Sequence, residues 1–99
     1  MTKEIVISPD CLKLVKAILK KNIPDRTVVV FGSRVTGDVK PHSDLDLCIM
    51  GNQALSFTQL AQLREDFSES SLPIRVDLID WATLTPSFRK IIQAQALEI

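Results

Sequence analysis

Three short apolar runs stand out along the chain, and each has the composition of a β-strand. The first, Val28–Phe31, is β-branched and aromatic and stops at a glycine, which predicts a strand buried on both faces. The second follows Asp44 and extends to Met50, and the third is Ile74–Asp80. Because side chains alternate between the two faces of a strand, Asp44 and Asp46 are expected on one face of the second.

Apolar residues recur at helical spacing in three other stretches. Helices are predicted for Ser8–Asn22, for Ser56 to about Glu69, and from Thr85 onward, where a Ser or Thr cap can start each helix. Strands that alternate with helices predict an α/β (α+β) fold, with a small mixed β-sheet flanked by helices. The residues expected to face the core from the three helices are Cys11, Val15, Ile18 and Leu19; Phe57, Leu60, Leu63 and Phe67; and Phe88, Ile91, Ile92 and Gln95.

Composition limits the domain count and the partners. The 99 residues, 45% hydrophobic and 24% charged, are expected to form a single domain, residues 1–99. Lysine plus arginine equals aspartate plus glutamate at 12 each, so the chain lacks the basic surface of a protein that grips long nucleic acid. Its apolar runs are far shorter than a membrane span and its N-terminus lacks a signal-peptide core. We therefore expect no membrane contact and a cytoplasmic location.

The glycine that ends the first strand begins a candidate phosphate-binding turn. Gly32 allows a sharp turn and a close approach to a ligand, while Ser33 offers a hydroxyl group. If a helical turn follows through Thr36, its backbone N–H groups also favour an anion. A Walker-type loop is excluded, although Gly32 and Gly37 have a suitable separation, because Asp38–Val39 stands where Lys followed by Ser or Thr is required.

The pair Asp44 and Asp46 is a candidate metal site. Two carboxylates at the mouth of a strand repel each other unless a cation lies between them, and hard oxygen ligands favour Mg²⁺. The alternative is that these aspartates only cap a turn. An EF-hand loop is excluded, because the glycine and the terminal glutamate that it needs do not follow at the required places.

The other potentially reactive side chains, one histidine and two cysteines, are assigned no role. His42 is the single histidine of the chain, and an isolated loop histidine is more often a solvated side chain than a catalytic base. Cys11 and Cys48 are far apart and have neither metal-ligand nor redox spacing, so both are expected to be reduced.

Several positions match one known signature together. They are Phe31–Arg34, Gly37–Asp38 and Ser43–Leu47, with ten residues between Ser33 and Asp44. This stretch resembles the signature of the nucleotidyltransferase (polymerase β-like) superfamily, in its minimal, single-domain branch. The resemblance implies the palm-like fold of these transferases.

The resemblance also implies roles for individual residues. Asp44 and Asp46 would hold Mg²⁺ on a nucleoside triphosphate such as ATP, and a third carboxylate would complete a second metal site and activate an acceptor hydroxyl. Gly32–Ser33 would hold the β- and γ-phosphates. Arg34 and Ser43 belong to the same matching stretch and are candidate nucleotide contacts.

Two residues compete for the place of the third carboxylate. Asp77 and Asp80 point to opposite faces of a straight strand, so only one of them can join the Asp pair, and the sequence does not decide the register. The resemblance selects Asp77, because the third carboxylate of the family lies in a Val-Asp-Leu context. Asp80 is then expected to cap the turn before Trp81. A charge among apolar neighbours in a central strand is also costly to bury, which independently points to a function for Asp77.

The minimal branch is found paired with a small helical HEPN protein as antitoxin and toxin. The resemblance therefore implies that the chain transfers AMP from ATP to a tyrosine of a HEPN toxin; the chain itself contains no tyrosine. The alternative is a non-catalytic antitoxin that neutralises its partner by covering it, for which unpaired sheet edges would be suited. Transfer to a small molecule such as an aminoglycoside is disfavoured, because no second domain is expected. The sequence leaves a homodimer open beside the hetero-oligomer.

Overall fold

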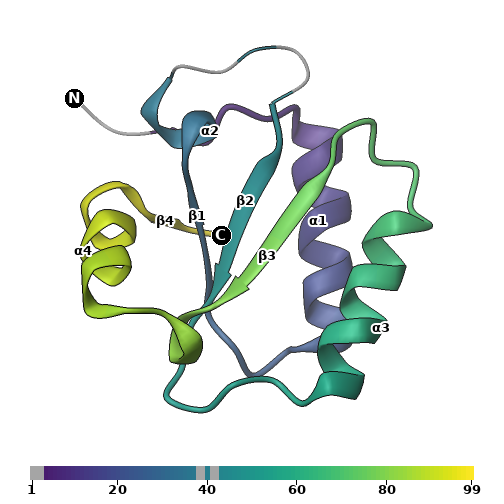
Figure 1. Ribbon diagram of the computed structural model, residues 1–99. Helices are drawn as coiled ribbons and strands as arrows, with labels where there is room; N and C mark the ends of the chain where they lie inside the picture. Colours follow the sequence, from purple (N-terminus) through teal and green to yellow (C-terminus); the bar gives the residue numbers. More distant parts are fainter. Residues whose placement is uncertain (1–3, 38–39, 41–42) are drawn as a thin grey trace.

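The described residues form a four-stranded mixed sheet with the strand order β3-β2-β1-β4 (Figure 1). The computed structural model describes residues 4–37, 40 and 43–99. Strands β2 and β3 run parallel, whereas β1 is antiparallel to both β2 and β4. The strands are β1 (Val28–Phe31), β2 (Leu45–Ile49), β3 (Val76–Asp80) and β4 (Leu97–Glu98).

The three longer helices begin at the caps that the sequence predicts. The side chains of Ser8, Ser56 and Thr85 each accept a backbone N–H from the residue three positions later, and Ser56 with Gln59 forms a complete capping box. These bonds satisfy N–H groups that have no partner within the helix. The helices are α1 (Pro9–Asn22), α2 (Ser33–Thr36), α3 (Phe57–Ser68) and α4 (Pro86–Gln95), with a 3₁₀ turn η1 (Trp81–Thr83).

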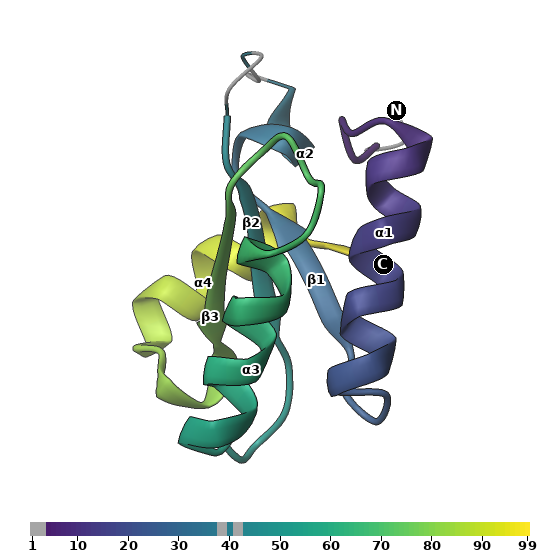
Figure 2. The ribbon, with the colours of Figure 1, turned by 90° about the vertical axis from the view of Figure 1, so that its right-hand side faces the viewer.

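The sheet lies between two helical layers. Helices α1 and α3 lie side by side on one face, and α4 lies on the opposite one (Figures 1 and 2). On the α4 side, Phe31 of β1 meets Phe88 edge to face, with ring centroids 6.2 Å apart. We call this side of the sheet the α4 face. The predicted α/β fold is thereby confirmed. The core on the other side joins Val15, Ile18, Leu19, Leu63 and Phe67 of the helices to Val28, Val30, Leu45, Leu47, Ile49 and Leu78 of the strands.

Some residues predicted to face the core do not. Phe57 is 89% exposed, whereas Leu63 and Phe67 of the same helix are buried. Phe57 lies in the first turn of α3, ahead of the part of the helix that packs on the core. Ile91 is 53% exposed, whereas Ile92 is buried; Phe88 is 39% exposed but does face the sheet, since its ring contacts Phe31. Among the described helices α4 alone covers its side of the sheet, so only one narrow stripe of this helix is enclosed.

The structure assigns neither cysteine a chemical role. Both thiols are free, as predicted. Cys48 is fully buried in β2, and burial raises its pKa to about 11, with a further contribution from the negative charge of Asp80. A thiol of this kind is protonated and unreactive at neutral pH.

The C-terminal segment adds a strand that the sequence pattern does not predict. After α4, Leu97 and Glu98 pair with Val30 and Val29 of β1. This pairing places the end of α4 beside the end of β1, where the candidate site lies. Within the described part of the chain, the helices are too short or too polar to cross a bilayer.

Candidate active site

The acidic residues singled out in the sequence lie where β1 ends and β2 and β3 begin. In the parallel pairing of β2 with β3, Asp46 is the register partner of Asp77. On its other side Asp46 lies opposite Phe31, the last residue of β1. Asp44 directly precedes β2 and has the same parity as Asp46. The structure therefore places Asp46 and Asp77 as neighbours on the α4 face, with Asp44 at the same end of the sheet.

The turn after β1 is in contact with this acidic pair. Gly32 has φ 81° and ψ −158°, a conformation that is essentially restricted to glycine. A Cβ atom added to Gly32 would collide with Oδ2 of Asp46 and lie 3.3 Å from its Cγ. The helical turn predicted through Thr36 follows as α2. The Asp46 carboxylate thus lies directly against the backbone of the candidate phosphate-binding turn.

The electrostatics of the acids suit a bound cation. Burial raises the pKa of the Asp46 carboxyl above its ordinary value, and the negative charges of Asp77 and then Asp44 raise it further. Each carboxylate therefore makes ionisation of Asp46 less favourable. A divalent cation would reverse this effect, and an all-oxygen donor set is the type that Mg²⁺ prefers. The chemistry of the three side chains fits the ion.

The three acids do not yet form a closed metal site. Across residues 4–37, 40 and 43–99, no group of three or more His, Cys, Asp or Glu side chains is arranged to hold a metal ion. Asp44, Asp46 and Asp77 are close enough for their charges to interact, but their oxygens are not gathered around one point. Ligation of one cation by all three carboxylates would therefore require these side chains to move closer together.

Arg34 and Ser43 lie near this end of the sheet, but their polar groups are engaged with the loop. The Arg34 side chain is buried, and its Nε and Nη2 donate to the backbone carbonyl of Ser43 at 3.1 and 2.8 Å. Its Nη1 donates to the carbonyl of Val6 at 2.8 Å. The Ser43 hydroxyl accepts the backbone N–H of Lys40 at 2.9 Å. In this arrangement both residues hold the segment that leads to Asp44, and Arg34 does not present its charge at the surface.

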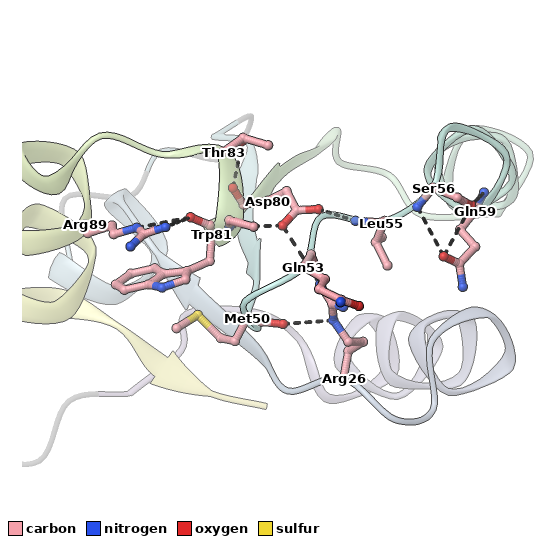
Figure 3. Close-up of polar contacts among 11 residues, drawn as sticks. Arg26, Met50, Gln53, Leu55, Ser56, Gln59, Asp80, Trp81, Thr83 and Arg89 are labelled. Atoms are coloured by element: carbon pink, nitrogen blue, oxygen red, sulfur yellow. Dashed lines mark hydrogen bonds and ion pairs between the residues drawn. The ribbon is translucent and has the colours of Figure 1, made fainter.

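Asp80 lies at the other end of β3, in a separate polar network (Figure 3). Its carboxylate accepts the backbone N–H groups of Leu55 and Ala82 at 2.7 and 3.2 Å. Arg26 lies 3.9 Å from the same carboxylate and donates to the carbonyl of Met50 at 2.9 Å. The expectation that Asp80 caps the turn before Trp81 is confirmed, since Asp80 is the N-cap of η1.

The surroundings of Asp77 differ from those that the sequence suggested. Strand β3 is at an edge of the sheet rather than in its centre, and Asp77 is exposed. The cost of burying a charge therefore does not apply to Asp77, and its assignment depends on its position beside Asp46. Asp77 also borders a hollow of about 480 Å³ between β3 and α3, whose lining includes Arg64 and Arg75.

One residue at this end of the sheet was missed as a site residue. Gln95, the last residue of α4, accepts the backbone N–H of Gly32 through its side-chain Oε1 at 2.7 Å. The sequence placed Gln95 only on the core-facing side of a helix, because the pairing of β4 with β1 that brings it here has no local signal. Asp38, part of the matching motif, and His42 lie outside the described residues.

Comparison with known proteins agrees with this arrangement. Residues 13–99 match the family "Polymerase beta, Nucleotidyltransferase". The chain belongs to this family. It is 50% identical over 90 residues to the Haemophilus influenzae protein named "Probable protein adenylyltransferase MntA", an alignment that covers 91% of this chain and 79% of the relative. The chain is thus a nucleotidyltransferase by family, with the resemblance in its motif confirmed.

Two solved structures have the same fold as this chain. A minimal nucleotidyltransferase superimposes with a TM-score of 0.71 at 26% identity, over 94% of this chain and 97% of that one. A chain from a toxin–antitoxin complex with AMP-PNP superimposes with a TM-score of 0.72 at 23% identity, over 87% of this chain and 69% of that one. At 23% identity the second match supports only the fold of this chain.

Proposed function

We propose that this nucleotidyltransferase uses Mg²⁺ and ATP to transfer AMP to a hydroxyl group of a partner toxin, and so acts as an antitoxin. The observation that carries the proposal is the placement of Asp46, which is paired in register with Asp77 and lies against Gly32. An adenylyltransferase relative at 50% identity supports the choice of reaction. The partner and the nucleotide are proposed by analogy with a structural neighbour of the same fold, which comes from a toxin–antitoxin complex with AMP-PNP.

Each residue of the site has a proposed task. Asp44 and Asp46 would hold Mg²⁺, with Asp77 completing a second metal position, and two bound ions would stabilise the entering and leaving oxygens. Asp77, the exposed member, would also accept the proton of the incoming hydroxyl. Gly32–Ser33 would hold the β- and γ-phosphates through backbone N–H groups and the serine hydroxyl.

In the proposed reaction one bond to the α-phosphorus of ATP forms and one breaks. The acceptor oxygen forms a bond to the α-phosphorus of ATP, and the bond from that phosphorus to the bridging oxygen breaks. Pyrophosphate leaves, and the proton of the hydroxyl passes to the carboxylate or to water. We propose a tyrosine of a HEPN toxin as the acceptor. The 99 residues contain no tyrosine, which agrees with an acceptor that is supplied by the toxin.

The test is labelling of the partner toxin by ATP labelled in its α-phosphate. Wild-type protein with Mg²⁺ should label the toxin, and mass spectrometry should locate AMP on a tyrosine. Asp44→Asn combined with Asp46→Asn should reduce the rate by at least about 10³-fold, since removal of stabilising charge from a transfer site costs several kcal/mol. Asp25→Asn, at an exposed position near the opposite end of β1, is the matched control and should leave labelling unchanged.

A second candidate function is neutralisation by occlusion. The observation that favours it is that the acids, as described, are not gathered into a metal-holding cluster. An edge strand such as β3 can also pair with a partner chain. If the double Asn variant still binds the toxin and still protects cells from it, occlusion rather than AMP transfer is the antitoxin mechanism.

A further inference from the structure

Gln95 connects the end of α4 to the turn at which the proposed function places the phosphates. Its Oε1 accepts the backbone N–H of Gly32 at 2.7 Å, although the two residues are far apart in the sequence. Gln95 is partly buried, and it is the last residue of its helix. The Gln95 side chain therefore links the C-terminal end of α4 to the backbone of Gly32.

The strand that follows α4 explains why this contact forms. Leu97 of β4 lies opposite Val30 of β1, and continuing the same antiparallel register by two residues brings Gln95 opposite Gly32. Hydrogen-bonded pairs recur every two residues in such a ladder. Gly32 is two residues beyond Val30, so its N–H points to where an acceptor on the neighbouring strand would lie. The backbone of Gln95 already belongs to α4. Its side-chain carbonyl takes the place of the missing strand carbonyl and satisfies the last N–H of the ladder.

We propose that Gln95 is a positioning residue for the nucleotide site, acting through Gly32. Glycine has the widest conformational freedom of all residues, so each hydrogen bond at Gly32 narrows the range that its backbone, with φ 81°, can sample. Within the turn its carbonyl accepts the N–H groups of Val35 and Thr36, whereas its own N–H is held from outside the turn by Gln95. The Asp46 carboxylate lies against this same backbone. By holding the N–H of Gly32, Gln95 fixes the distance between the turn and the carboxylate. It thereby sets the affinity for Mg²⁺-bound nucleoside triphosphate, an inference that rests on the proposed function.

The experiment compares two glutamines on one helix. Gln95→Leu keeps the approximate size of the side chain and removes the acceptor, and Gln93→Leu makes the same change at an exposed position of α4. The dissociation constant of Mg-ATP is measured by calorimetry, and KM and kcat by transfer of labelled AMP to the toxin. Gln95→Leu should weaken Mg-ATP binding about tenfold, the equivalent of one buried hydrogen bond. KM should rise with kcat changed less, because the turn holds the ground state and the transition state alike.

Three outcomes separate this inference from the proposed function. If wild type and Gln95→Leu bind Mg-ATP equally well, while only the melting temperature of the variant falls, Gln95 is a purely structural residue and the inference is overturned. If Gln93→Leu weakens binding as much, the effect is not specific to Gly32 and the inference is again overturned. If wild-type protein does not bind Mg-ATP at all, the proposed function is lost as well. Should Gln95→Leu not fold, Gln95→Asn replaces it, because it retains a polar amide but is too short to reach Gly32.

Discussion

Asp77 and Asp80 lie three residues apart on β3 and have opposite surroundings. Asp80 is 7% exposed, and its carboxylate accepts two backbone N–H groups and lies near Arg26. Asp77 is exposed and lies beside Asp46, another carboxylate. The Asp80 carboxylate is thus held by backbone donors, whereas Asp77 has a second carboxylate as its register partner. The comparison indicates that the buried aspartate is a structural anchor, whereas the exposed aspartate lies beside the carboxylate with which it would share the proposed metal site.

The two ends of the sheet differ in the same way. At the Asp80 end, Arg26 and Arg89 donate to backbone carbonyls and, with Asp80, tie three loops together (Figure 3). At the other end, the pKa of Asp46 is raised by burial and by two acidic neighbours. Such an arrangement costs folding free energy unless something outside the chain compensates it. Unbalanced charge of this kind is typical of functional sites, where a ligand completes the structure.

The largest expected effect is the difference in stability between the separate Asp80→Ala and Asp77→Ala variants. Asp80→Ala leaves two backbone N–H groups and Arg26 without their shared partner. We expect a loss of about 3 kcal/mol of unfolding free energy, or roughly 12–24 °C in Tm for a domain of this size. Asp77→Ala, on the same strand, should change stability by no more than about 0.5 kcal/mol. Thermal unfolding measures both.

Transfer activity should show the reverse order. Asp77→Ala should abolish AMP transfer, whereas Asp80→Ala, assayed well below its Tm, should retain it. If the two substitutions reduce stability equally, or if Asp77→Ala keeps full activity, the division of β3 into an anchoring end and a reactive end is wrong.

Much of this division could be predicted from the chain, because it depends on local signals. The apolar run Val28–Phe31 forms a strand that ends where Gly32 follows. The Ser and Thr caps mark the starts of the three longer helices. Strand parity alone separates Asp77 from Asp80. The choice between the two needed the family resemblance, because the register of β3 against β2 is set by packing of the whole sheet.

The features that could not be predicted depend on contacts between distant segments. Nothing in the sequence near Leu97 indicates that it pairs with β1, so neither β4 nor the contact of Gln95 with Gly32 was foreseen. Phe57 has suitable spacing for a buried stripe but lies in the first turn of α3 and is exposed. Arg34 has the chemistry of a phosphate contact, and only the structure shows that its donors reach backbone carbonyls.

Two glycines give an intermediate test of the reactive end. Gly32 and Gly37 both have positive φ, 81° and 89°, so alanine is strained at either position by roughly 1–3 kcal/mol. At Gly32 the added Cβ also collides with the Asp46 carboxylate, whereas no described atom lies within 4 Å of the Cβ position at Gly37. Gly32→Ala should therefore lose both stability and AMP transfer, and Gly37→Ala chiefly stability. Equal loss of transfer per folded molecule would show that backbone strain, and not the contact with Asp46, is what matters.

The smallest expected effect is the response of stability to pH at Asp46. Its raised pKa means that the native state binds this proton more tightly than the unfolded chain. The unfolding free energy should therefore fall as pH rises from the ordinary value near 4 through the raised value, and stay lower above it. Asp46→Asn removes the charge and keeps the shape, so it should raise Tm at neutral pH by a few degrees at most, and the gain should disappear in acid. Unfolding curves from about pH 3 to about pH 8 measure this, with exposed Asp25→Asn as the control. Mg²⁺ should supply the same relief to wild type, raising its Tm at neutral pH while leaving Asp46→Asn nearly unchanged, because the unbalanced charge that the ion would compensate is then gone.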